Sequence, residues 1–414
     1  MVRYLLFGFL LLWGSTGWAG TLTLEECLQL AQQNHPGWQG VQLQRDEAAA
    51  DLAAARSGYW PSVDARAGYT VQAAEQAIVV GGRAQPTQQQ EYPFWTLAAE
   101  QTLYDFGRTG SRVERGSAQA VAAAAEVDNY RQELWLAVTA AYYRVLIAEK
   151  LLEAARDEVT QMGEHRRVAA ALYQEGMVTR NDLLQAEVKL AGSGQQQLVR
   201  ENGLAVAWLQ LNSLLGRGLE TRDTLMTPPV VVAADFDPWQ HPSLAAGRAR
   251  LAAAEAEQRQ SRSRFWPQLY LRGEANYVEN EYVREQTILV GTLGLRVNLF
   301  DGFASSAAMT RATAVRQEAS AQLDESARRL RLDYETARRD ASTAAARVQL
   351  LQTALQAGEE NLRLSQERYQ AQTGTASDVV DAQSLLSQTR SDYWQAVFEE
   401  QLALARVRRA SGQL

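Results

Sequence analysis

Two aspartates at helical spacing are the residues of this chain best placed to do chemistry. Asp378 and Asp381 stand three residues apart, so on a helix they lie on one face. Carboxylates held close together raise one another's pKa and attract cations, because the charged form is disfavoured until a counterion arrives. An aspartate near a helix start also satisfies free backbone N–H groups, and this interpretation applies to Asp378 and to Asp182. The pattern therefore predicts a cation-attracting surface, a helix cap, or both.

The histidines and the cysteine form no catalytic or metal-binding pattern. His35, His165 and His241 are far apart in sequence, and the first and last each precede a proline. No glycine-rich phosphate loop follows a strand, and no Cys/His cluster has metal-ligand spacing. Cys27 is the single cysteine, so it cannot form an internal disulfide, and we expect it on a packed helix face. The sequence therefore predicts neither an enzyme nor a bound cofactor or metal.

The charge balance and the N-terminus limit where the chain works. The chain has 41 basic and 48 acidic side chains and no long basic run, which disfavours a nucleic-acid partner. Arg3, the apolar run Tyr4–Trp13 and the small residues Gly17 and Ala19 predict a secretory signal peptide over residues 1–19. The apolar run is too short for a membrane anchor, and no later run reaches the roughly 18 residues of a transmembrane helix.

The chain contains two halves of common plan. Trp60-Pro61 recurs as Trp266-Pro267, and Leu103-Tyr104-Asp105 recurs as Leu299-Phe300-Asp301. The spacing between the two copies of each motif differs, so the first half carries extra residues between Pro61 and Leu103. We predict a first repeat over 20–216, a proline-containing linker over 217–240 and a second repeat over 241–414.

Each half should contain a helix and then two strands. Pro36 and Pro242 suit the first turn of a helix, and each Trp-Pro pair ends one, because proline restricts the residue before it. Period-two alternation follows, apolar on one face and largely polar on the other, over the four segments 63–71, 95–103, 269–277 and 293–299. Strands of about ten residues suit a tilted membrane span, although a soluble sheet packed by one face has the same pattern.

Charges and aromatic residues favour the membrane interpretation of these strands. The polar faces carry charged side chains, as a water-filled lumen would require: Arg66, Glu100, Arg272, Glu274 and Arg296. Aromatic residues flank the strands, as in interfacial girdles: Tyr59, Trp60, Trp95, Phe265, Trp266 and Phe300. Four strands cannot close a barrel around a lumen, so the pattern requires an oligomer.

Long helical segments without proline complete each half. They extend over about 110–175 and 305–372, and each would be on the order of 100 Å long. A short turn then reverses the chain, and a return helix follows with apolar residues one heptad apart. A tube that crosses a periplasm needs such a length, whereas a bilayer does not.

Several motifs in this order carry a resemblance to a known family. They are the opening Leu22–Leu28 with Asn34-His35-Pro36, the paired Trp-Pro strand openings, and the paired turn segments 173–186 and 368–383. Together they resemble the TolC family of trimeric outer-membrane efflux and secretion ducts over nearly the whole chain. The resemblance implies a mainly α chain with a membrane β-barrel. A trimer would form a long antiparallel coiled-coil barrel and a 12-stranded β-barrel with four strands per chain.

The resemblance also implies roles for the two turns. In the family they form a periplasmic tip that meets an adaptor protein and closes like an iris. Asp378 and Asp381 resemble the aspartates that ring the closed aperture, and Asp182 and Tyr369 resemble partners in a closing bond. Adaptor contact is expected at the tips: Gly176, Met177, Val178, Thr373, Gly374 and Thr375. Gln372 stands at the usual glycine position and Gly374 replaces a usual basic residue, so the closing network departs from the family pattern.

The expected function is therefore an exit duct in the outer membrane, with its helical tube in the periplasm. The resemblance implies a homotrimer that contacts outer-membrane lipid, a periplasmic adaptor and an inner-membrane pump. A periplasmic coiled-coil adaptor or binding protein is the alternative, and the four alternating strands are the feature that separates the two. The sequence does not identify the exported substrate or the cognate pump, and it leaves efflux and protein secretion both open.

Overall fold

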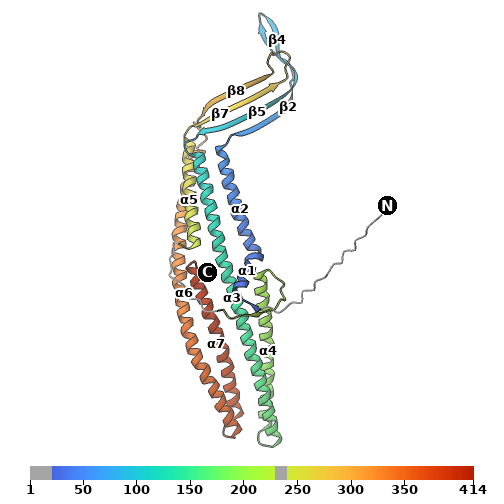
Figure 1. Ribbon diagram of the computed structural model, residues 1–414, viewed down its shortest axis with the longest axis vertical. Helices are drawn as coiled ribbons and strands as arrows, with labels where there is room; N and C mark the ends of the chain where they lie inside the picture. The colour runs from blue at the N-terminus through green and yellow to red at the C-terminus, as the bar shows by residue number, and fades with distance from the viewer. Residues whose placement is uncertain (1–20, 229–239) are drawn as a thin grey trace, which may run out of the picture. The chain divides into compact units, whose positions relative to one another are not determined.

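The computed structural model describes residues 21–228 and 240–414 (Figure 1). The predicted signal peptide and part of the predicted linker lie outside these residues. The chain divides into two compact units. Of the described residues, the helical unit comprises 21–38, 131–228 and 332–414, and the strand unit comprises 39–130 and 240–331. The repeat boundaries predicted from the sequence differ from these units, because each unit draws on both halves, and those boundaries stay a prediction.

In the strand unit, helices end at the two Trp-Pro pairs as predicted. Helix α2 (Pro36–Arg56) and helix α5 (Pro242–Arg262) each continue into a single 3-10 turn. Trp60 and Trp266 then have extended backbones, with φ of -108° and -104°. Since proline disfavours helical geometry in the residue before it, the chain enters a strand at both places.

The four predicted strands form one antiparallel sheet in the order β2-β5-β7-β8 (Figure 1). Its members are β2 (Ser62–Val71), β5 (Glu91–Tyr104), β7 (Gln268–Val278) and β8 (Thr287–Arg296). Strands β2 and β8 are the edges of this sheet. The neighbours β5 and β7 come from different halves of the chain, so the sheet joins the two repeats.

One face of the sheet is predominantly apolar. The row Ala65, Leu97, Ala275 and Leu289 crosses all four strands in register. Leu97 and Leu289 are 46% and 79% exposed, although buried leucine is the norm in a packed core. Within residues 21–228 and 240–414, no other layer covers these leucines, so an apolar environment from outside these residues is expected to do so.

Strand β8 ends earlier than the sequence predicted. The alternation suggested a strand that reaches Leu299, but β8 ends at Arg296, which pairs with Gln268. Gln268 is the first residue of β7, and Pro267 before it has no backbone N–H to extend the ladder. The prediction was wrong at this end because the partner strand stops there.

The extra residues of the first half form a hairpin that was not predicted from the sequence. Strand β3 (Gln76–Val80) pairs with β4 (Arg83–Gln88) around Gly81 and Gly82, which both have positive φ. Asn280, 2% exposed, holds the hairpin base by donating a hydrogen bond to the Thr87 carbonyl at 2.8 Å. The sequence did contain a pattern typical of a β-hairpin, namely Ile-Val-Val followed by a Gly-Gly turn.

The helical unit contains two helix pairs that reverse at short turns. Helix α3 (Arg108–Gln174) turns into α4 (Arg180–Leu215), and α6 (Ala304–Gln370) turns into α7 (Ala376–Ala410), as Figure 1 shows. Both α3 and α6 have 67 residues and contribute to both units. A straight helix of that size is about 100 Å long, as the sequence predicted.

Short elements near the chain start complete the helical unit. Strand β1 (Thr21–Leu22) pairs in parallel with β6 (Thr224–Leu225), and helix α1 (Leu24–Asn34) follows β1. The Tyr142 hydroxyl lies within hydrogen-bonding distance of the Leu22 and Met226 carbonyls, so α3 supports this strand pair. Cys27 is fully buried, as predicted, and burial raises the pKa of its thiol to about 12.

Within residues 21–228 and 240–414, no helix combines the length and the apolar character needed to cross a membrane.

Candidate functional site at the two helix turns

The first turn joins α3 to α4 through two standard helix ends. Gly176 has φ of +71°, and the Met177 N–H donates to the Leu172 carbonyl at 2.9 Å, which closes α3 in a left-handed cap. Thr179 then begins α4. Its backbone N–H and hydroxyl donate to the Asp182 carboxylate at 2.9 and 2.8 Å. This capping box fixes the Asp182 side chain at the start of α4.

The second turn repeats this construction with one strained substitution. Thr375 begins α7, and its N–H donates to the Asp378 carboxylate at 2.9 Å. Hydrogen bonds from Thr375, the backbone one foremost, hold the pKa of Asp378 below its ordinary value of 3.8. The left-handed position is filled by Gln372, with φ of +61°. The predicted capping role of Asp182 and Asp378 is therefore observed, and each sits at the third helical position behind a threonine cap.

The two turns contact each other through a side chain. The Gln372 amide donates to the Met177 sulfur at 3.4 Å. A glycine at position 372 would release backbone strain of about 1–2 kcal/mol but would remove this contact. Gln372 in place of the usual glycine thus gives a turn with backbone strain, but its side chain contacts the other turn.

The neighbouring departure, Gly374, has a steric reason in this chain. A Cβ at position 374 would lie 3.0 Å from the Arg368 Cβ and 3.4 Å from the Arg368 carbonyl carbon. The Gly374 N–H also donates to the Arg368 carbonyl at 3.1 Å. A basic side chain at 374 would therefore push Arg368 away and disturb the end of α6.

Asp182 and Asp381 line one hollow between the turns, of about 500 Å³. Its wall comes from α3, the start of α4 and the start of α7, and includes His165 and Lys189. Asp378 lies outside that wall and is engaged with Thr375 instead. The structure thus separates the two aspartates that the sequence grouped. One carboxylate caps a helix, and the other faces an open space.

Tyr369 packs between the helices and does not bond to Asp182. Its ring lies against the apolar cluster of Leu362, Val379, Ala382 and Leu386. Its hydroxyl is buried without a hydrogen-bond partner among the described residues. Burial, followed by the nearby charge of Asp182, raises the pKa of this hydroxyl. Tyr369 and Asp182, the expected closing partners, are therefore near each other, but the Asp182 carboxylate accepts its hydrogen bonds from Thr179.

His165 is the neighbour of Tyr369 that the sequence reading did not assign to the site. It is 8% exposed, and its ring centroid is 5.7 Å from that of Tyr369. Burial lowers the pKa of the imidazole. The residue lies on α3, about two and a half helical turns before that helix ends at Gln174, and this position was the available signal.

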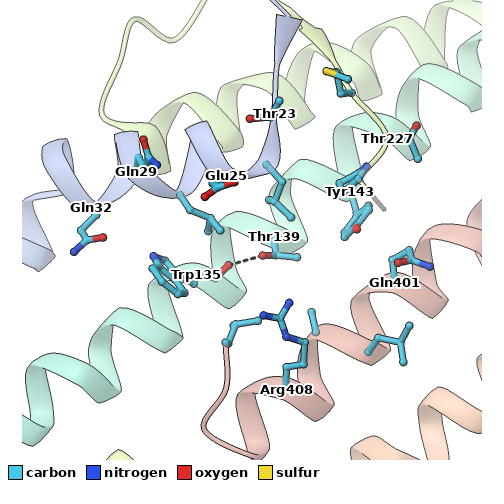
Figure 2. A pocket seen from close by; sticks show the side chains of 17 residues that line it. Thr23, Glu25, Gln29, Gln32, Trp135, Thr139, Tyr143, Thr227, Gln401 and Arg408 are labelled. Carbon is cyan, nitrogen blue, oxygen red and sulfur yellow. Dashed lines mark hydrogen bonds between the residues drawn. The ribbon is translucent and has the colours of Figure 1, made fainter. Parts of the chain in front are cut away.

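A second hollow in the helical unit has a volume of about 730 Å³ (Figure 2). Figure 2 shows Glu25 from α1, Trp135 and Tyr143 from α3, and Arg408 from α7 around it. The Thr139 hydroxyl donates to the Trp135 carbonyl at 2.7 Å and so serves the helix itself. The sequence gave no signal for this hollow, because three separate helices contribute its wall.

The part of the chain that the structure describes has no group of three or more His, Cys, Asp or Glu side chains arranged to hold a metal ion.

Comparison with known proteins agrees with this architecture. The model of the family described as outer membrane efflux protein matches residues 27–217 and 239–413. The alkaline protease secretion protein AprF of Pseudomonas aeruginosa is 25% identical over 77% of this chain and 69% of that protein. The outer membrane protein TolC of Vibrio cholerae is 22% identical over 97% of this chain and 92% of that protein.

A solved structure has the same fold. The outer membrane protein VceC of Vibrio cholerae superposes with a TM-score of 0.82 at 18% identity, over 94% of this chain and 96% of that one. The family match spans most of the chain and includes both strand pairs and both turns. The chain therefore belongs to the family of outer membrane efflux proteins, the exit ducts of the outer membrane.

Proposed function

We propose that three copies of this chain form one duct that carries substrates out through the outer membrane. The observation that carries the proposal is the four-stranded sheet, with an exposed apolar face, an ion-paired opposite face and two edge strands. Four strands are too few to enclose a lumen, whereas the twelve strands of three copies form a barrel of channel size. Edge strand β8 of one copy then pairs with edge strand β2 of the next, which leaves no open edge.

The two faces of the sheet fit a barrel with lipid outside and water inside. Leu289, Leu293 and Leu295 of β8 are each at least 65% exposed, and lipid would cover them. Glu100 lies on the opposite face and forms ion pairs there with Arg272 and Arg296. Trp60 and Trp266 stand just before the first strand of each pair, where interfacial aromatic residues are typical.

The helix turns are the proposed meeting place with other components. A periplasmic adaptor would contact the tip residues Gly176, Met177, Val178, Thr373, Gly374 and Thr375. Met177 is 61% exposed and presents an adaptable apolar side chain. An inner-membrane pump would supply the substrate and the energy, since the described residues hold no metal-binding cluster and the sequence shows no phosphate loop.

Unfolded polypeptides are the substrate class that we favour. AprF and PrtF, two of the relatives, are named for the secretion of proteases. Their identity to this chain is 25% and 26%, and each match covers more than three quarters of it. Secretion of a protease by cells that carry the chain with its adaptor and pump, and loss of that secretion without the chain, would support this choice. Unchanged secretion with loss of drug efflux would favour small molecules instead.

The aperture is proposed to close where the turns of three copies converge. Asp378 and Asp381 would form rings of carboxylates there, and Asp182 and Tyr369 would hold the helix pairs in the closed arrangement. The support is local: Asp182 and Asp381 face one hollow, and Tyr369 packs against the α6–α7 seam.

The alternative, a periplasmic adaptor or binding protein, fits the helices but not the sheet. Such a protein would have to leave the leucines of β8 in water. Native mass measurement in mild detergent tests the proposal. A trimer is expected, and a folded monomer or a detergent-free soluble form would favour the alternative.

A further inference from the structure

The polar face of the four-stranded sheet carries equal numbers of opposite charges. Its carboxylates are Asp64, Glu100 and Glu274, and its guanidinium groups are Arg66, Arg272 and Arg296. All six alternate with the apolar residues of the other face, so they project to the same side of the sheet. The formal charge of this face is therefore zero, although the whole chain is acidic.

Glu100 is the residue that connects these charges. It lies directly opposite Arg272 across β5 and β7, and its Oε2 is 3.6 Å from the Arg272 Nη1. Its Oε1 is 3.5 Å from the Nη2 of Arg296 on β8. One carboxylate thus faces two guanidinium groups from two further strands. Arg272 also pairs with Glu274 on its own strand.

The neighbouring contacts hold the two arginines in place along the wall. The Arg296 guanidinium lies 4.8 Å from the centre of the Tyr270 ring, on which it stacks. Glu100 is the less exposed partner, at 28% against 57% for Arg296. The arginines therefore lie along the sheet toward Glu100, and their charge is compensated at the wall.

We infer that Glu100 sets the ion preference of the strand section of the duct. The inference rests on the proposed function, in which this face lines the lumen. With Glu100 in place, passing ions meet two compensated guanidinium groups, and the section favours neither sign. Without the carboxylate, Arg296 loses its carboxylate partner and becomes free to reach into the lumen, while Arg272 keeps only Glu274. Each copy then gains one positive charge, and three copies gain three around one pore.

The test is the reversal potential of single channels in planar bilayers under a KCl gradient at low ionic strength, where charges are least screened. The variant Glu100→Gln should raise the permeability of chloride relative to potassium by about twofold or more. Asp64→Asn is the matched control, because it changes the formal charge of the same face equally. Asp64 is exposed and has no ion-pair partner among the described residues, so its shift should be smaller.

Two further variants complete the design. Glu100→Gln combined with Arg296→Gln returns the face to zero charge and should restore the original preference. Arg296→Gln alone should shift the preference toward potassium. If Glu100→Gln produces no channels, Arg296→Gln alone tests the inference, because its ion preference must shift toward potassium.

The outcomes separate the inference from the proposed function. Equal shifts for Glu100→Gln and Asp64→Asn, or no shift in either Glu100→Gln or Arg296→Gln, would overturn the role of Glu100 while channels still conduct. Absence of conductance in the unaltered protein would instead contradict the duct itself.

Discussion

The side-chain amide of Gln372 donates a hydrogen bond to the sulfur of Met177 and joins the two turns of the helical unit. Gln372 makes this contact from a left-handed backbone conformation that favours glycine. Gln372 therefore provides both the contact and the backbone strain. Substitutions at Gln372 and at Met177 can separate the two effects.

Gln372→Gly should stabilise the second turn locally by about 1 kcal/mol, because the release of strain exceeds the loss of one weak hydrogen bond to sulfur. Amide hydrogen exchange at Thr373 and Gly374 is the measurement, and exchange should become slower. Met177→Leu is the control, since it removes the acceptor and keeps the strain. Faster exchange in Gln372→Gly than in the unaltered chain would show that the contact outweighs the strain.

The start of α7 should loosen in acid at a pH set by Asp378. The folded pKa of Asp378 lies below its ordinary value of 3.8, so its stabilising contribution is complete above the unfolded pKa. It is lost as the pH falls through the folded pKa, below about pH 4. A spin label at exposed Ser377 should therefore become mobile only in that range. Asp378→Asn should be mobile throughout and show no such transition.

A higher midpoint would indicate a different environment of the Asp378 carboxylate. Loosening at a pH above the ordinary value for aspartate would mean that crowding with neighbouring copies outweighs the Thr375 hydrogen bonds at Asp378.

Tyr369 should act through its ring and not through its hydroxyl. Tyr369→Phe removes a group that has no partner among the described residues, so single-channel conductance should change little. Tyr369→Ala removes the ring from the Leu362–Leu386 cluster and should raise the open probability, because the α6–α7 seam loosens. Higher conductance in Tyr369→Phe would instead show that the hydroxyl finds its partner in the assembled duct.

The two aspartates of the second turn should differ in their effect on cations. Asp381 lines the hollow and accepts no hydrogen bond from the described residues, whereas Asp378 caps α7. Asp381→Ala should therefore weaken cation selectivity and block by multivalent cations more than Asp378→Ala does. If the double variant keeps full selectivity and block, neither residue rings an aperture.

Much of the architecture was predictable from local sequence, because local rules fix it. Proline placed the ends of α2 and α5, period-two alternation gave the four strands, and absence of proline gave the two long helices. The early end of β8 and the hairpin at residues 76–88 were missed. The first depends on where a partner strand begins, and the second lies within the extra residues of the first half, for which no element was predicted.

The candidate site was less predictable, since side-chain partners depend on packing. Asp182 and Asp378 stand at equivalent positions in the two repeats, and each completes the capping box at the start of a helix. Spacing alone did not reveal that Asp378 turns to Thr375 while Asp381 faces the hollow. Nor did it identify His165 as the neighbour of Tyr369, because residues on separate helices meet there.

The most direct test of the central claim is cross-linking between the two edges of the sheet. One cysteine at Ala65 in β2 is combined in turn with a cysteine at Leu289, Gly291, Leu293 or Leu295 in β8, and the protein is oxidised in outer membranes. The account predicts that one of these pairs gives covalent trimers and nothing larger. Each variant with only one added cysteine should give no trimer, because β2 of one copy meets β8 of the next. The native Cys27 is fully buried and is common to all variants. Monomers from every pair, or covalent dimers from Ala65→Cys alone, would contradict a closed ring of three copies.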